Sequence, residues 1–205
     1  MVMNSMFSHY DHRSIVGILE LVNHSPPAAM HTPVLIVPGI NNSGESHWQS
    51  HWQRRHPGFE RLEVDDWDHP ECGHWSDAIG RAVERLGSRT VIVAHSLGCL
   101  AVAHWAARSG SAAGAALLVA LPDPHGPAFP SEARGFAPLP EGRMPFPSII
   151  VASGDDPYAN AGLTRRCAHA WGSRLHHAGN QGHLNAASGL GEWPAGWDLL
   201  ESLRT

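Results

Sequence analysis

Short apolar runs rich in β-branched residues alternate with helix-like segments along most of the chain, and this alternation most constrains the fold. We expect strands over residues 34–37, 59–64, 90–94, 114–120, 148–152 and 174–177, and helices over residues 46–55, 75–86, 97–108, 161–171 and 197–203. Neighbouring parallel strands need a crossover connection, which a helix usually supplies. The sequence therefore predicts an α/β fold: a doubly wound, mostly parallel six-stranded sheet with helices on both faces.

The pattern also indicates how the chain is divided. At 205 residues, one domain is the expectation, and we place it at residues 32–205. Residues 1–31 differ in composition and end in a Ser-Pro-Pro turn signal, so we expect an N-terminal extension there. A short helix over residues 11–22, a disordered segment, and translation from Met30 all remain open. The Pro- and Gly-rich residues 121–147 indicate a long surface loop.

Composition excludes several kinds of function. The net charge is −5, and all 14 basic residues are arginine, which excludes any mechanism that needs a lysine. No basic cluster suggests a nucleic-acid or membrane partner. The three cysteines have no paired spacing, and no apolar run approaches the ~18 residues of a membrane span. We expect a cytoplasmic protein with no cofactor and no metal.

The segment that most strongly indicates chemistry is residues 91–100. A buried strand is followed by Ser96, and a helix begins at once. This is the setting of a nucleophile elbow, whose usual pattern is Gly-x-Ser-x-Gly. Ala94 stands in for the first glycine, and Gly98 keeps the second. The alternative is that Ser96 only caps the helix.

A serine hydroxyl needs a base, and the base needs an orienting carboxylate. In this kind of fold the chain order is serine, acid, histidine. Asp156 follows the strand over 148–152 and is our candidate acid. The alternatives are that the neighbouring Asp155 is the acid, or that the Asp-Pro sequence only forms a turn. His183 lies in a glycine-flanked loop after the last strand and is our candidate base. Order and spacing select it from 16 histidines.

Stabilising a tetrahedral oxyanion takes two backbone N–H groups. We assign one to Leu97, at the start of the helix after Ser96, and the other to Ile40, in the loop after the first strand. A plain glycine turn at residues 38–44 is the alternative for the second.

Other groups of residues are weaker indications of function. His47 and His51 are one helical turn apart, but no third metal ligand is evident. Cys99 should pack as a small apolar residue. We expect four tryptophans to lie in the core or a pocket wall rather than to stack on nucleic acid: Trp48, Trp52, Trp67 and Trp75.

Several segments together resemble the small serine hydrolases of the α/β-hydrolase superfamily, specifically the family of retinoblastoma-binding protein 9 and YdeN-type hydrolases. The matching segments are residues 37–39, 46–49, 65–67, 94–99, 153–157 and 182–189. The resemblance spans residues 33 to about 203 and implies a compact hydrolase without a large lid that uses Ser96, Asp156 and His183.

We therefore expect a carboxylesterase-like serine hydrolase that cleaves small esters, or amides, through an acyl-enzyme. Its partner would be a small-molecule acyl substrate, and the oligomeric state stays undetermined. Two alternatives remain. An acyltransferase would use the same three residues, and a non-catalytic protein-binding module would keep only the scaffold.

Overall fold

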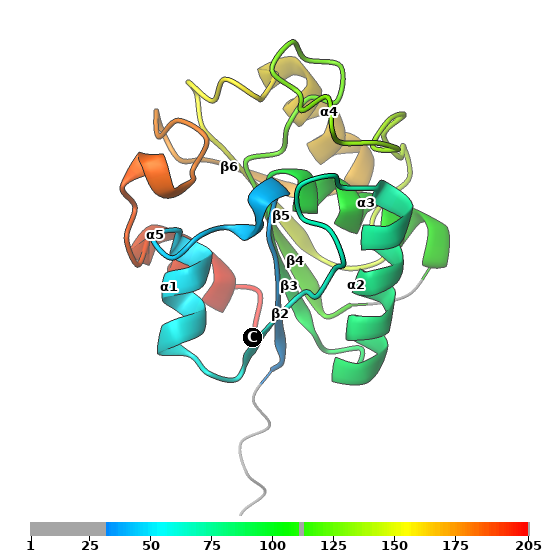
Figure 1. Ribbon diagram of the computed structural model, residues 1–205, viewed down its shortest axis with the longest axis vertical. Coiled ribbons are helices and arrows are strands. Elements are labelled where there is room, and N and C mark those ends of the chain that lie inside the picture. The colour runs from blue at the N-terminus through cyan, green and yellow to red at the C-terminus, as the bar shows by residue number, and fades with distance from the viewer. Residues whose placement is uncertain (1–31, 111–112, 205) are drawn as a thin grey trace, which may run out of the picture. The chain divides into compact units, whose positions relative to one another are not determined.

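The computed structural model describes residues 32–110 and 113–204, so the expected extension at residues 1–31 lies outside the described residues. Six strands form one sheet in which every pair is parallel (Figure 1). The strand order is β2-β1-β3-β4-β5-β6. The strands are β1 (Val34–Val37), β2 (Phe59–Arg61), β3 (Val91–His95), β4 (Ala115–Val119), β5 (Ser148–Ala152) and β6 (Arg174–His177). The predicted six-stranded parallel sheet is confirmed.

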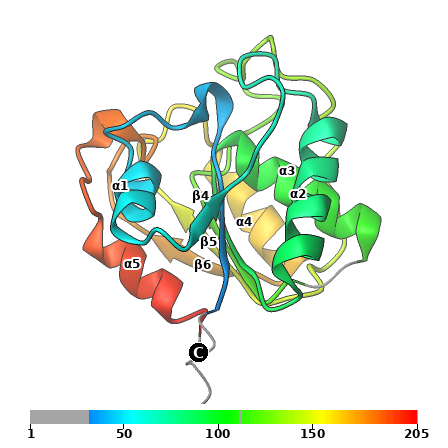
Figure 2. The ribbon, with the colours of Figure 1, turned by 60° about the horizontal axis from the view of Figure 1, so that its bottom comes forward.

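Helices cover both faces of this sheet (Figure 2). The α-helices are α1 (Trp48–Arg55), α2 (Cys72–Leu86), α3 (Leu97–Ser109), α4 (Ala161–Trp171) and α5 (Pro194–Glu201), and two short 3₁₀ helices are η1 (Ile40–Asn42) and η2 (Ala186–Ser188). Helices α1 and α5 lie on one face, and α2, α3 and α4 lie on the other. The doubly wound arrangement is therefore also as predicted.

Side-chain alternation along the strands explains why their sequences are apolar throughout. Successive residues of a strand point to opposite faces. In β1, Leu35 and Val37 pack in the core under α2–α4, whereas Val34 and Ile36 pack in the core under α1 and α5. Because both faces are covered, neither set of positions can be polar.

Several element ends differ from the expected ones, and the residues at the first turn account for the starts of α1, α2 and α5. Helix α1 begins at Trp48 because the His47 side chain accepts a hydrogen bond from the Gln49 N–H. Helix α2 begins three residues early, where the Glu71 carboxylate caps the N–H of His74. Helix α5 begins at Pro194, a residue suited to a first turn.

The segment over residues 121–147 contains no helix or strand, as expected, but it is not confined to the surface. Phe136 is 1% exposed, and Met144 and Phe146 are also buried. They join the core under α2–α4.

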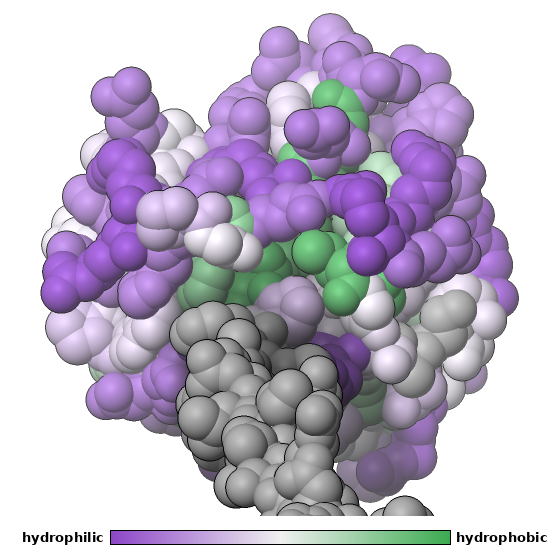
Figure 3. Space-filling view, turned by 90° about the horizontal axis from the view of Figure 1, so that it is seen from below, coloured by the Kyte–Doolittle hydropathy of each residue, from purple (hydrophilic) through white to green (hydrophobic). Residues whose placement is uncertain are grey.

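Viewed from the end of the sheet where β1 begins, the described surface is mostly hydrophilic, with a small hydrophobic group near its centre (Figure 3). Among the described residues, no helix is both long and apolar enough to span a membrane.

Candidate active site

Ser96 occupies a tight turn between the end of β3 and the start of α3. Its backbone is in a left-handed region that side chains rarely adopt, with φ 53° and ψ −124°. Its neighbours must be small for this turn to fit. A Cβ on Gly39 would lie 2.9 Å from the Ser96 Cβ, and a Cβ on Gly98 would lie 2.6 Å from the carbonyl oxygens of Val37 and Pro38. These approaches are the physical reason for glycine at both positions.

His183 and Asp156 join Ser96 in an unbroken hydrogen-bonded chain. The His183 Nε2 lies 2.8 Å from the Ser96 Oγ. The His183 Nδ1 lies 2.9 Å from both carboxylate oxygens of Asp156. A carboxylate only accepts hydrogen bonds, so Nδ1 carries the proton and Nε2 is free to accept the serine hydroxyl proton. The three residues selected by chain order therefore converge.

Burial strengthens this chain of contacts. The Asp156 side chain is fully buried and that of His183 is 10% exposed. Ser96 is 8% exposed. In such a low-dielectric setting, the attraction between a carboxylate and an imidazolium is stronger than in water. The Tyr158 N–H also donates to Asp156 Oδ1 at 2.9 Å, which fixes the carboxylate in place.

Asp155, the alternative acid, has a different role. Its Oδ1 accepts hydrogen bonds from the Ser153 hydroxyl and from the Gly182 N–H, both at 2.8 Å. The Ser153 Oγ in turn accepts the Gln181 N–H at 2.8 Å. These bonds tie the loop after β5 to the loop that carries His183. The Ser153 hydroxyl, followed by the Gly182 N–H, lowers the pKa of Asp155.

His95 also holds the His183 loop, a contact that sequence reasoning did not predict. The His95 Nε2 donates to the His183 carbonyl at 2.9 Å. Burial holds the pKa of His95 well below its usual value, and burial followed by the nearby Arg61 lowers the pKa of His47 to about 3. Both rings are therefore neutral. The signal available in the sequence was only the position of His95 next to Ser96.

Tyr158 is a further neighbour that sequence reasoning missed. Its ring centroid lies 4.4 Å from that of His183. At 37% exposure, Tyr158 is the one large hydrophobic side chain among the described residues that is exposed. Its place two residues after Asp156, in an Asp-Pro turn, was the available signal.

A cavity of about 540 Å³ opens onto this site. Ser96, His183 and Tyr158 line it, together with Leu97 and Ile40. Leu97 is the first residue of α3, so its N–H has no acceptor within the helix. The Ile40 loop is held by the Asn41 N–H, which donates to the Trp67 carbonyl at 3.0 Å. Both residues expected to bind an oxyanion thus border the same cavity as Ser96.

The remaining sequence candidates are structural. His47 caps α1, and the His51 Nδ1 lies 3.1 Å from the Arg54 guanidinium. Among residues 32–110 and 113–204, no group of three His, Cys, Asp or Glu side chains could hold a metal ion. Cys99 is fully buried, and its thiol donates to the Val119 carbonyl. Burial also holds the pKa of this thiol above its usual range. Three of the four singled-out tryptophans are buried, and Trp67 packs against the core.

Comparison with known proteins agrees with this architecture. A YdeN-like hydrolase from Pectobacterium atrosepticum superposes with a TM-score of 0.74 at 28% identity, over 84% of this chain and 90% of that one. The ydeN gene product of Bacillus subtilis gives 0.69 at 21% identity, over 84% and 98%. The carboxylesterase CesB of B. subtilis gives 0.55 at 10% identity, over 86% and 84%.

These likenesses define the class of the fold as that of the α/β hydrolases. The sequence pattern of the serine hydrolase family matches residues 34–202, and the chain belongs to that family. A search of curated proteins finds no match. The expected relation to YdeN-type hydrolases is confirmed.

Proposed function

We propose that this protein cleaves small esters through an acyl-enzyme, with Ser96 as nucleophile, His183 as base and Asp156 as the orienting acid. The observation that carries the proposal is the continuous chain from Asp156 through His183 to the Ser96 Oγ, with both links shorter than 3 Å. A serine that only capped a helix would need neither the imidazole nor the buried carboxylate.

In the first step the Ser96 Oγ attacks the ester carbonyl carbon while its proton passes to the His183 Nε2. The imidazolium that forms is stabilised by the Asp156 carboxylate, which receives the Nδ1–H hydrogen bond. The carbonyl oxygen becomes an anion directed at the N–H groups of Leu97 and Ile40. Loss of one such donor typically costs ~3 kcal/mol of transition-state stabilisation. The dipole of α3 adds to this stabilisation, since Leu97 is its first residue.

Collapse of the tetrahedral intermediate breaks the bond between the carbonyl carbon and the leaving oxygen. His183 gives its proton to that oxygen, and the alcohol departs. A water molecule then enters, loses a proton to His183 and attacks the acyl carbon. The second intermediate breaks its bond to the Ser96 Oγ, which regains the proton from His183, and the acid is released. If an alcohol or amine enters in place of water, the same steps give acyl transfer.

Acyl-chain profiling with chromogenic esters tests the proposal. We expect 4-nitrophenyl esters of short acids to be cleaved, since the cavity of about 540 Å³ holds a small substrate. Product analysis with an added alcohol or amine separates hydrolysis from acyl transfer. Ser96→Ala and His183→Ala should each lower kcat by at least about 10³-fold. Normal turnover by either variant, or no turnover by the parent of any ester, amide or transfer substrate, would refute the proposal.

A further inference from the structure

The cavity that opens onto Ser96 has an acidic lining. Asp68 and Glu132 both border it, and no lysine or arginine does. The other ionisable lining residues are His69, Tyr158 and His183. Arg134 follows Glu132 by two residues but does not line the cavity. Any charged part of a substrate in this cavity would therefore meet two carboxylates and no fixed cation.

The two carboxylates come from different parts of the chain. Asp68 lies in the connection between β2 and α2, and Glu132 lies in the loop over residues 121–147. The Asp68 N–H and the His69 N–H donate to the Asp66 carboxylate at 2.8 and 2.9 Å, which fixes the turn that carries Asp68. Across the described ranges, neither the Asp68 nor the Glu132 carboxylate has a hydrogen-bond or ion-pair partner.

The surface beside this cavity has the same sign. A neighbouring cavity of about 280 Å³ shares His69 and carries five carboxylates against one arginine: Glu63, Asp65, Asp66, Glu71 and Asp77, with Arg81. Clefts lined by one sign of charge concentrate the field and attract ligands of opposite charge. The carboxylates of the neighbouring cavity therefore add to the negative charge of Asp68 and Glu132 on this side of the molecule.

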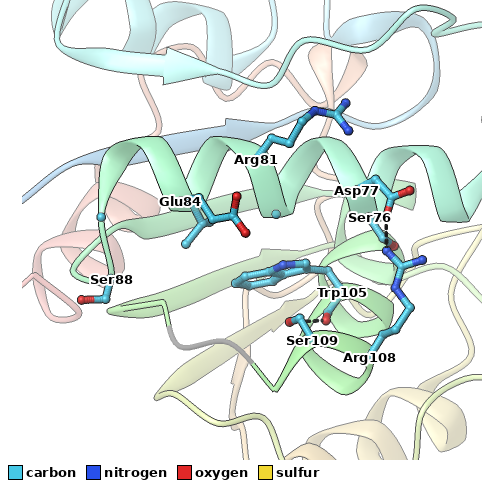
Figure 4. A pocket seen from close by; sticks show the side chains of 11 residues that line it. Ser76, Asp77, Arg81, Glu84, Ser88, Trp105, Arg108 and Ser109 are labelled. Carbon is cyan, nitrogen blue, oxygen red and sulfur yellow. Dashed lines mark hydrogen bonds and ion pairs between the residues drawn. The ribbon is translucent and has the colours of Figure 1, made fainter.

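The acidic excess is not a general property of the hollows on this protein. The cavity between α2 and α3 has a volume of about 510 Å³ and a balanced lining (Figure 4). There the Arg108 guanidinium pairs with the Asp77 carboxylate, and Arg81 and Glu84 are the other charged residues that line it. Of these three cavities, the acidic excess is therefore found in the one that holds the serine and histidine and in the one beside it.

From this charge distribution we infer that the Ser96 cavity selects esters that carry a cationic, amine-type group near the scissile bond. The inference rests on the proposed function, because it assigns a substrate class to the same site. A trimethylammonium or alkylammonium group would sit between Asp68 and Glu132, while the ester carbonyl reaches Ser96. Acyl groups that end in a carboxylate would be repelled.

Matched pairs of esters that differ only in charge test this inference. Butyrylcholine and 3,3-dimethylbutyl butyrate place the charge on the alcohol side. The 4-nitrophenyl esters of 4-(trimethylammonio)butyric acid and 5,5-dimethylhexanoic acid place it on the acyl side. Each kcat/KM is divided by the hydroxide-catalysed rate of the same ester, so that intrinsic reactivity cancels. Exposed charge pairs contribute modestly, so we expect the cationic ester of at least one pair to be favoured about 3- to 10-fold.

Two further measurements assign the preference to these carboxylates. The ratio within the favoured pair should fall to about one in the double variant Asp68→Asn, Glu132→Gln. Glu84→Gln, which neutralises an exposed carboxylate in the other cavity, should leave the ratio unchanged. In the parent protein the ratio should also shrink between about 20 and 500 mM salt, because salt screens exposed charges.

The outcomes separate the two proposals. A ratio at or below one in both pairs overturns the cationic preference, and so does a ratio that neither the double variant nor salt reduces. In both cases turnover of the neutral esters leaves the proposed function standing. If neither neutral nor charged esters react and Ser96 is not labelled by a fluorophosphonate, the proposed function itself fails and the substrate class falls with it.

Discussion

Replacing Gly98 with alanine tests the packing that shapes the turn at Ser96. The added methyl would lie 2.6 Å from the carbonyl oxygens of both Val37 and Pro38, and 3.0 Å from Val37 Cγ1. The two oxygens belong to the backbone at the end of a central strand, so neither can rotate away. The start of α3 must therefore move away from β1, and Ser96 and the Leu97 N–H must move with it.

The expected cost is that of overpacking a well-packed core, about 1–3 kcal/mol. In a domain of this size each kcal/mol lowers Tm by roughly 2–4 °C, so the fall in Tm should lie between roughly 2 and 12 °C. The higher helix propensity of alanine, about 1 kcal/mol, offsets part of this cost. Activity should fall further than stability, because a shift of about 1 Å in reacting groups can cost about 100-fold in rate.

The assay is thermal unfolding followed by ester turnover at 25 °C. Gly58→Ala is the matched control, because a methyl added at Gly58 would have nothing within 4 Å and the backbone there is not left-handed. Gly58→Ala should change neither Tm nor kcat appreciably. If Gly98→Ala kept the parental Tm and the parental kcat/KM, the close approach of α3 to β1 would not be what shapes this turn.

Asp156, His47 and Cys99 each allow a further test. Asp156→Asn should lower kcat by about 10³- to 10⁴-fold in ester assays, because the imidazolium loses its buried counter-charge; a loss below tenfold would argue against Asp156 as the orienting acid. In the folded protein the pKa of His47 is about 3, whereas in the unfolded chain it has the usual value of 6.5. Between pH 6.5 and 3 the unfolded chain is therefore protonated at His47 and the folded protein is not, so the free energy of unfolding falls as the pH drops through this range. The free energy of unfolding should change with a slope of up to about 1.4 kcal/mol per pH unit. Denaturant titrations at several pH values should find a smaller slope in His47→Asn, which keeps a side chain that can cap α1. Equal slopes in the two proteins would contradict a buried, neutral His47 ring. Because burial raises the pKa of the Cys99 thiol, iodoacetamide at pH 8 should modify Cys99 only after the protein unfolds. Cys99→Ala should still react with a fluorophosphonate. Rapid modification of Cys99 in the native protein would contradict its burial.

The parallel sheet was predictable because its strands are buried on both faces. A run such as Val91–His95 is apolar at nearly every position, so it stands out from the amphipathic helices on either side. Four elements, β1, β5, β6 and α4, have the expected bounds. Elements whose ends depend on a capping side chain, such as the Glu71 carboxylate at α2, were less predictable, because a cap is recognised by geometry.

The candidate site was predictable only as far as chain order carries information. Ser96, Asp156 and His183 follow the ends of separate strands, and parallel strands bring those ends to one edge of the sheet. Asp155 and Asp156 are adjacent in the sequence, and only the three-dimensional contacts distinguish them. Asp156 contacts the His183 imidazole, whereas Asp155 contacts the loop that carries His183.

Contacts made through backbone atoms were beyond sequence reasoning. The hydrogen bond from His95 to the His183 carbonyl joins residues that are 88 positions apart, and no side-chain pattern announces it. The acidic lining of the cavity likewise depends on how the loop over residues 121–147 folds back toward Asp68. Irregular segments lack the periodicity that identifies helices and strands.

Peptide mapping after reaction with a fluorophosphonate shows directly whether Ser96 is the activated nucleophile. We expect one adduct per chain, located on the Ser96 Oγ, absent from Ser96→Ala and formed far more slowly by His183→Ala. An adduct at another residue, or equal labelling of folded Ser96→Ala, would contradict this role of Ser96.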